Sequence, residues 1–298
     1  MISNLFLALS VLINIVIFLK YKKLSYMLNV YDYPNERKLH KHKTPLLGGL
    51  IIIINLLFFL ALYFLSEYNE GDTFYFLNKS NFNLFFFTAF LIFLLGFIDD
   101  KFDLNPNLKL FLLTLIISNI LWLDDTLLIS QLTFSFIDTS LNIGKYSFIF
   151  TLLCFLLFIN ACNMFDGINL QSVSYFIILI FYLNIIGFNS VLLNCLLISL
   201  LVIFALNKKG KIFMGDSGVY LISFIMGYIL VKIYNFDNKL SPDLIFILMM
   251  VPGIDMLRLF IVRILNKKNP FSPDRKHIHH ILLKKFSYNQ SLLILNFL

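Results

Sequence analysis

Long apolar runs recur along this chain and restrict its fold more than any other feature. Nine of them approach the roughly 20 residues that a helix needs to cross a bilayer. Hydrophobic residues make up 59% of the chain and charged residues only 14%, which excludes one water-soluble globule. The sequence therefore predicts an all-α, polytopic integral membrane helix bundle. The runs are 2–19, 46–65, 82–98, 108–123, 146–159, 170–188, 191–206, 219–234 and 244–264.

The apolar stretch 291–298 has the composition of a tenth span but is too short to cross a bilayer. We therefore expect about nine to ten spans. The sequence contains no internal repeat and no low-complexity linker. Residues 1–298 are accordingly predicted to form a single membrane-embedded domain.

The distribution of basic residues predicts the topology. The first run has no Lys or Arg before it and three shortly after it, which indicates an anchor with its amino terminus outside rather than a cleaved signal. With that orientation, 20 of the 24 Lys and Arg residues lie in inside loops and 4 lie outside. The net charge of +7 is thus a topology signal, and no nucleic-acid partner is expected. We predict a multi-pass protein of the inner or plasma membrane.

Polar motifs cluster in the loops that this topology assigns to the cytoplasm. In Asp99-Asp100-Lys-Phe-Asp103, carboxylates spaced i and i+4 can share one side of a helix end and bridge Mg²⁺ to a diphosphate. The alternative is a solvated helix end just outside the bilayer. Asp124-Asp125 is an internal control, because it is the same dipeptide on the outer side without a companion motif. There we expect the solvated helix end.

Two further loops carry polar residues at span ends. Asn160, Asn163, Asp166 and Asn169 recur every three residues and stay near one helical face, which suits a ligand site or hydrogen bonds between helices. Asp216, between two glycines, begins another span, where it can hold a metal or cap the helix.

The last polar loop, residues 269–280, contains three imidazoles within a Pro-bounded segment. It suits the binding of phosphate oxygens. Zinc is the weaker interpretation, because the spacing of His277, His279 and His280 does not place three nitrogens on one helical face. In the preceding span, Pro252 predicts a kink. Asp255 and Arg258 form either a buried ion pair or part of the site.

Together these loops resemble a known family, the polyprenyl-phosphate N-acetylhexosamine-1-phosphate transferases, which begin several cell-envelope polysaccharides, O-antigen among them. Any one motif is weak, but five in order on one face are specific. Two features depart from the pattern. Asn169 and Leu170 replace an acid and a glycine, and the sequence ends just after the histidine loop, where the family usually continues through one or two further spans. The five segments are 31–49, 99–103, 160–166, 215–216 and 270–280.

The resemblance implies that a polyprenyl phosphate, such as undecaprenyl phosphate, attacks a UDP-N-acetylhexosamine and yields a polyprenyl-diphosphate sugar and UMP. Mg²⁺, or Mn²⁺ in its place, is the implied cofactor. Asp99 and Asp100 are the expected catalytic residues, and Asp216 and Asn163 the expected metal-site residues. The expected substrate-binding residues are Lys43, Asn160, Asp166, Asn169, Arg275, His277, His279 and His280. Because both substrates are anionic, the metal and the basic groups are expected to offset their repulsion.

Two other classes compete with this interpretation. An intramembrane prenyltransferase with an aspartate-rich Mg²⁺ motif would explain 99–103, but not the histidine loop. An ion-coupled transporter would place ionisable residues near the middle of spans, where only Asp255 and Arg258 come close. The sequence leaves the sugar, the polysaccharide pathway and the oligomeric state, including a homodimer, open.

Overall fold

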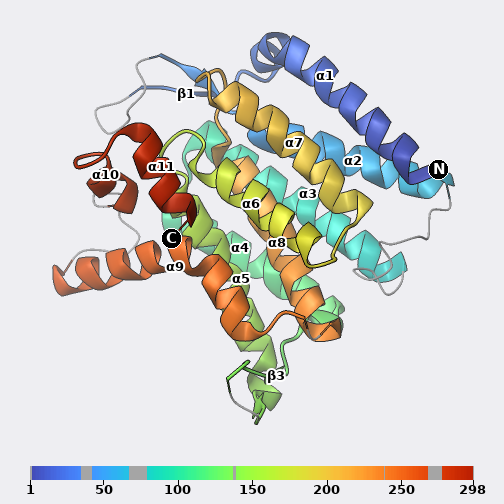
Figure 1. The fold of residues 1–298 in the computed structure, drawn as a ribbon, viewed down its shortest axis with the longest axis vertical. Helices are drawn as coiled ribbons and strands as arrows, with labels where there is room; N and C mark the ends of the chain where they lie inside the picture. The colour runs from blue at the N-terminus through green and yellow to red at the C-terminus, as the bar shows by residue number, and fades with distance from the viewer. Residues whose placement is uncertain are drawn as a thin grey trace.

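The computed structural model describes residues 2–34, 42–66, 79–136, 139–237, 239–267 and 277–297. These residues form a bundle of α-helices with two short β-hairpins (Figure 1). The helices are α1 (Ile2–Leu28), α2 (Gly48–Ser66), α3 (Lys79–Phe102), α4 (Pro106–Leu123), α5 (Ser147–Phe165), α6 (Gln171–Ile185), α7 (Val191–Asn207), α8 (Gly215–Phe236), α9 (Pro242–Leu265), α10 (Ile278–Leu282) and α11 (Tyr288–Phe297).

Each predicted apolar run lies in one of the helices α1 to α9 or extends past its ends by at most three residues, which confirms the all-α membrane fold. Within the described residues, six of them (α1, α3, α4, α5, α8 and α9) are long and apolar enough to cross a membrane. The apolar helices α2, α6 and α7 are shorter. Residues 291–297, from the stretch that resembled the start of a tenth span, lie in α11, a 10-residue helix that packs against α6.

Helix α8 is the centre of the bundle. Every residue from Ser217 to Ile233 is buried, because α2, α3 and α5 pack around it. A helix that is apolar on all sides lies either in a protein core or in a membrane, and α8 is covered by its neighbours in the bundle. The first turn of α8 therefore lies where the ends of other helices meet, and this turn carries Asp216.

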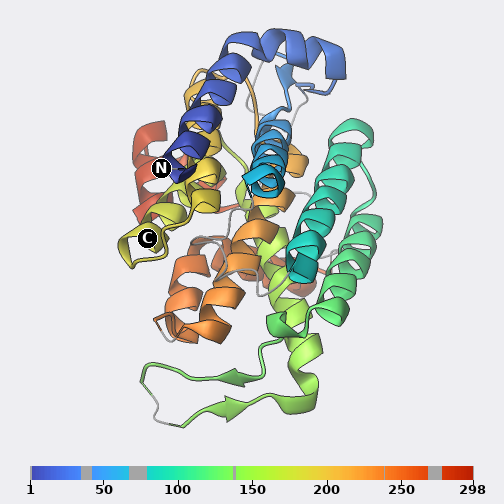
Figure 2. The ribbon, with the colours of Figure 1, turned by 90° about the vertical axis from the view of Figure 1, so that its right-hand side faces the viewer.

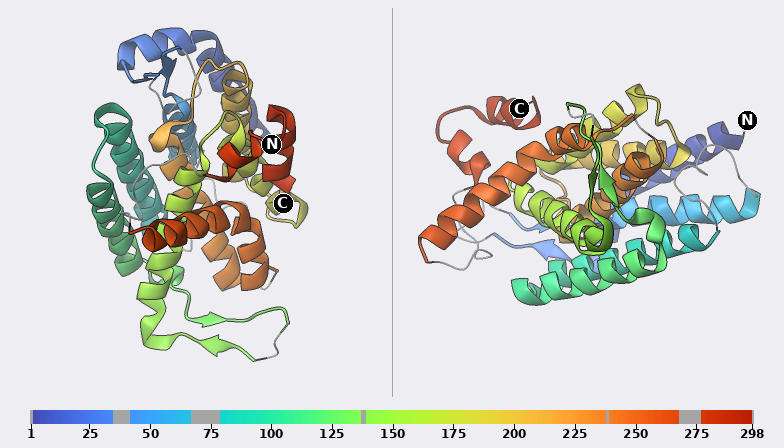
Figure 3. Two further views of the ribbon diagram at one scale, coloured as in Figure 1. Left: turned by 90° about the vertical axis from the view of Figure 1, so that its left-hand side faces the viewer. Right: turned by 90° about the horizontal axis from the view of Figure 1, so that it is seen from below.

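The two hairpins lie at opposite ends of the molecule (Figures 2 and 3). At one end, β1 (Tyr31–Asp32) pairs antiparallel with β2 (Thr44–Pro45). At the other end, β3 (Gln131–Leu132) pairs antiparallel with β4 (Leu141–Asn142), between the short helices η1 (Asp125–Leu127) and η2 (Gly144–Tyr146). Helix α9 changes direction along its length in Figure 1, as its internal Pro252 predicts.

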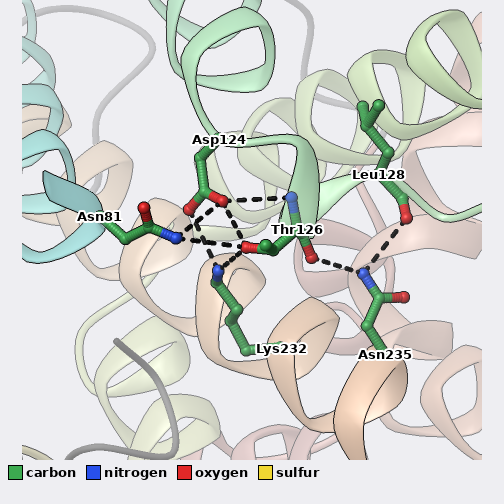
Figure 4. Close-up of polar contacts among 6 residues, drawn as sticks. All are labelled: Asn81, Asp124, Thr126, Leu128, Lys232 and Asn235. Atoms are coloured by element: carbon green, nitrogen blue, oxygen red, sulfur yellow. Dashed lines mark hydrogen bonds and ion pairs between the residues drawn. The ribbon is translucent and has the colours of Figure 1, made fainter. Parts of the chain in front are cut away.

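A buried ion pair joins three helices near the β3 end (Figure 4). Asp124, which ends α4, lies 3.0 Å from the Nζ of Lys232 in α8, and both side chains are almost fully buried. Asn81 in α3 donates to the same carboxylate at 3.0 Å, and Thr126 bonds both charged groups. The expected solvated helix end is correct for Asp125 but wrong for Asp124, because the carboxylate pairs with a lysine from a distant part of the chain.

Candidate active site

The ends of four helices bring together a cationic and two anionic side chains. Lys109, in the first turn of α4, has its Nζ 2.7 Å from Oδ2 of Asp99 and 3.7 Å from Oδ2 of Asp216. Asn163, near the end of α5, donates to Oδ1 of Asp216 at 2.8 Å. Three of the predicted site residues therefore meet, as the shared face of their loops predicted. Lys109 is a fourth member that the sequence interpretation used only as a topology charge.

The α3–α4 connection explains why Lys109 reaches back to Asp99. Helix α3 ends at Phe102, and Asp103 turns the chain with a left-handed φ of 49°. Asp99 accepts the Leu104 N–H at 3.0 Å, which fixes the turn against α3. The expectation that Asp103 shares a helical face with Asp99 is wrong, because the helix has already ended. A lysine in the first turn after a tight helix–helix connection is the signal that could have identified Lys109.

Asp100 holds the amino end of α8. Its Oδ1 accepts the Asp216 N–H at 2.7 Å, and its Oδ2 accepts the N–H and hydroxyl of Ser217 at 3.1 and 2.6 Å. Gly215 has φ +73°, and a Cβ there would lie 2.7 Å from Oδ2 of Asp100, so only glycine fits. The catalytic role expected for Asp100 stays a prediction. In the structure, this carboxylate satisfies backbone N–H groups that the helix itself leaves free.

The donor set suits Mg²⁺. Among the described residues, no group of three or more His, Cys, Asp or Glu side chains could hold a metal ion by itself. Mg²⁺ does not require one, because it is usually bound by one or two carboxylates with waters and substrate phosphates. Asp99 and Asp216 supply two carboxylates, and Lys109 between them shows that a positive charge is stable at this position. The side chain of Asp216 is 33% exposed, so substrate and ion can reach it.

The end of α5 links this carboxylate cluster to the histidines. Asp166 follows the helix and accepts a hydrogen bond from the hydroxyl of Ser172. Burial raises the pKa of Asp166 to about 6, and the bond from Ser172 offsets part of that rise. Asn160 donates to the Leu156 carbonyl of its own helix at 2.7 Å, and it makes no hydrogen bond to the cluster among the described residues.

The turn after α5 is packed against the histidine segment. A Cβ on Gly167 would lie 1.9 Å from Cε1 of His279, so the imidazole occupies the space that a side chain would fill. Leu170 has φ +67°, a left-handed conformation, at the position where the family resemblance predicts glycine. Its N–H donates to Oδ1 of Asn207 at 2.5 Å. The carbonyl of Asn169 accepts the hydroxyl of Tyr288 in α11.

The three histidines lie side by side. The rings of His277 and His279 are stacked with centroids 5.3 Å apart, and those of His279 and His280 are 4.4 Å apart. Burial, with a smaller contribution from the two neighbouring imidazoles, lowers the pKa of His279 to about 3. His279 is therefore neutral at pH 7 and can hydrogen-bond a phosphate without offsetting its charge. Its buried Nδ1 has no partner among the described residues.

Of the other two expected substrate-binding residues, one lies beside the β1–β2 hairpin and one falls outside the described residues. Lys43 is exposed, and its Nζ lies 5.0 Å from the ring centroid of Tyr31, beside the β1–β2 hairpin. Arg275 falls within 268–276, outside the described residues. Sequence reasoning did not assign a site role to Ser217 or Asn207, which position the first turn of α8 and the turn before α6.

Comparisons with known proteins identify the family of this chain. The family described as glycosyl transferase family 4 matches residues 82–234, just over half of the chain and the part that contains Asp99, Asn163 and Asp216. The relatives below each carry the name undecaprenyl-phosphate alpha-N-acetylglucosaminyl 1-phosphate transferase. One from Salmonella typhi is 28% identical over 98% of this chain and 81% of its own length. One from Escherichia coli is 26% identical over 92% and 75%, and one from Thermotoga maritima is 30% identical over 89% and 76%.

The resemblance inferred from the loops is thus confirmed across nearly the whole chain. The chain belongs to glycosyl transferase family 4.

Proposed function

We propose that this protein transfers N-acetylhexosamine-1-phosphate from a UDP-sugar to a polyprenyl phosphate, which yields a polyprenyl-diphosphate sugar and UMP. The observation that carries the proposal is the meeting of Asp99, Lys109, Asn163 and Asp216 at the ends of four helices. Two carboxylates beside a lysine form a site for a cation and a phosphate, and the named relatives act on undecaprenyl phosphate.

Asp99 and Asp216 would hold Mg²⁺, and the side-chain amide of Asn163 hydrogen-bonds Asp216. Bound Mg²⁺ would neutralise phosphate charge and polarise the phosphorus that is attacked. Lys109 adds a second positive charge at the same place, which reduces the repulsion between two anionic substrates. Asp100 would act through position, because it holds the first turn of α8 and therefore Asp216.

The attacking group needs little help from a base. A phosphate monoester has a second pKa near ~6, so the lipid phosphate is largely dianionic at neutral pH. Asp99 or Asp100 would receive a remaining proton, although each already accepts hydrogen bonds, Asp99 from the Leu104 N–H and Asp100 from the first turn of α8. The site therefore works chiefly by positioning and by charge compensation.

The UDP-sugar donor would be recognised near the turn at 166–170. Asn169 stands where the family resemblance predicts an acid, and an amide can donate as well as accept a hydrogen bond. We expect Asn169→Asp to change the ratio of kcat/KM between UDP-N-acetylhexosamines. If kcat/KM falls by the same factor for every donor, Asn169 does not select the donor.

Incorporation of label from radioactive UDP-sugars into an organic-extractable lipid tests the function. Purified full-length protein with undecaprenyl phosphate and Mg²⁺ should form labelled lipid, and EDTA should stop the reaction until excess Mg²⁺ is added. Asp216→Asn should be inactive although folded. Transfer of a prenyl group instead, or solute uptake without lipid labelling, would contradict the proposal.

The site would face the cytoplasm of the inner membrane, with the amino terminus outside. The basis is the bias of Lys and Arg toward the loops that carry the motifs. A membrane-impermeant thiol reagent should label Asp237→Cys in intact cells. It should label Lys101→Cys and Lys208→Cys, which are exposed positions on the motif side, only after the membrane is opened, and labelling of either in intact cells would reverse the orientation.

A further inference from the structure

Asp255 connects two parts of the structure that sequence alone did not join. It lies in α9 after the Pro252 kink and is 2% exposed. Its Oδ1 accepts from Nη2 of Arg258 at 2.7 Å and from the N–H of Ile278 at 3.1 Å. Its Oδ2 lies 3.2 Å from Nδ1 of His277. Both oxygens are used, and two of the three contacts go to the start of the histidine segment.

The contact with His277 fixes which ring nitrogen carries hydrogen. An ionised carboxylate only accepts hydrogen bonds, so the facing Nδ1 must carry the proton. The other nitrogen, Nε2, makes no hydrogen bond among the described residues and is left for a ligand. In the neutral ring it accepts a hydrogen bond, and in the protonated ring it donates one to an anion.

The same carboxylate also sets the position of His279. Its bond to the Ile278 N–H fixes the first residue of α10, directly before His279. His279 stacks on the ring of His277 and fills the space above Gly167, at the turn that follows α5. A chain of contacts therefore runs from α9 through the two imidazoles to the turn beside Asp166.

We propose that Asp255 is a positioning residue of the transfer site: it holds His277 with Nε2 directed to a phosphate oxygen of a substrate and keeps His279 against Gly167. This inference rests on the proposed function. The phosphate oxygen belongs to the diphosphate of the UDP-sugar or to the lipid phosphate. A plain ion pair between Asp255 and Arg258 does not require the two contacts to His277 and Ile278.

Asp255→Asn is the sharp test, because it keeps the shape of the side chain. Its amide nitrogen can donate to Nδ1 of His277, which would place the ring hydrogen on Nε2 and invert the acceptor role. We expect kcat/KM for lipid labelling to fall by about ten- to a hundredfold, the range found when the groups that orient a site are removed. Asp255→Glu should recover part of the activity. The KM that rises, for UDP-sugar or for undecaprenyl phosphate, identifies which phosphate His277 contacts.

A double-mutant cycle separates positioning from a structural effect. If Asp255 acts through His277, Asp255→Asn should have little further effect in a His277→Ala protein. If it only stabilises α9, it should lower kcat/KM by the same factor in both backgrounds, and that result would overturn the inference. Asp243→Asn, in the first turn of the same helix, is the matched control and should retain wild-type kcat/KM.

Failure of the role proposed for Asp255 can be distinguished from failure of the proposed function. Wild-type protein that forms no labelled lipid refutes the function. Wild-type protein that forms it, alongside an Asp255→Asn variant with unchanged kinetics, refutes only the role of Asp255. The melting temperature of each variant in detergent shows whether a loss of activity reflects unfolding.

Discussion

Lys109 and Asp99, from consecutive helices, form an ion pair with 2.7 Å between Nζ and Oδ2. Asp99 is nearly buried, so its charge needs a partner within the protein. The same ammonium lies 3.7 Å from Asp216. A lysine thus supplies positive charge where we propose that Mg²⁺ binds, and this relationship generates the first prediction.

Lys109→Met should lower kcat/KM for lipid labelling by at least about a hundredfold, comparable with the loss of a group that stabilises charge in a transition state. Lys101→Met is the control. Lys101 is exposed near the end of α3, and its only described contact is with the ring of Phe102. Retention of near wild-type kcat/KM by folded Lys109→Met would remove Lys109 from the site.

Melting temperatures distinguish the stabilising effect of Lys109 from that of Mg²⁺. Without Lys109, the two carboxylates lack their shared cation, so the melting temperature in EDTA should fall. Mg²⁺ should then raise the melting temperature more in Lys109→Met than in the wild type, because a ligand stabilises the state that binds it. An equal Mg²⁺-induced rise in both proteins would argue against a metal beside Asp99 and Asp216.

Asp100→Asn should reduce both stability and activity, because it weakens the hydrogen bonds that hold α8. Bonds to a charged group contribute about 1.5–3 kcal/mol each, and an amide can accept only some of the three. Ser217→Ala removes one bond and should have an intermediate effect on the melting temperature. Asp216→Asn should abolish transfer without such a loss of stability. If Asp100→Asn and Asp216→Asn have equal melting temperatures, the capping role is refuted.

The sequence was sufficient to predict the membrane helices and the shared location of the carboxylate loops. Apolar runs report span length directly, and motifs at span ends must meet if the spans pack as one bundle. The sequence could not show that the adjacent residues Asp99 and Asp100 contact different partners. Lys109 pairs with the first and the backbone of α8 with the second, and only the packed helices determine this.

The sequence also could not predict contacts between residues that are distant in the chain. Asp124 has the same local pattern as Asp99, yet its partner Lys232 lies 108 residues away, so no local feature distinguishes a buried Asp124 from a solvated one. His277 and Asp255 were both noted, but their contact depends on the direction in which α9 leaves its kink.

Gly167→Ala should abolish transfer, because the added Cβ would lie 1.9 Å from one atom of the His279 ring and 2.1 Å from another. The histidine would have to move away from the turn, and the contacts between α5 and the histidine segment would be lost. Gly253→Ala in α9 is the control, since a Cβ there meets nothing within 4 Å. The measurement is kcat/KM for lipid labelling, and an active Gly167→Ala would show that this contact is dispensable.

Leu170 tests the departure from the expected glycine. Leu170→Ala removes most of the buried side chain but keeps a Cβ on a residue with left-handed backbone. Leu170→Gly removes the side chain and the Cβ together. A left-handed conformation costs a residue with a Cβ about 1–2 kcal/mol. Leu170→Gly should therefore be about 1 kcal/mol more stable than Leu170→Ala. The opposite order of melting temperatures would show that the turn relaxes out of the left-handed region.

The buried pair near the β3 end should matter for stability and not for catalysis. Lys232→Met leaves the carboxylate of Asp124 buried without its cation, which should cost about 3–5 kcal/mol. The double variant Lys232→Met, Asp124→Leu replaces both charges with apolar groups and should recover most of that loss. Lys232 lies 16 residues beyond Asp216 in the same helix, a separation of about 24 Å at 1.5 Å per residue. The folded double variant should therefore retain kcat/KM for lipid labelling, and a loss of activity at wild-type melting temperature would reveal coupling between the two ends of α8.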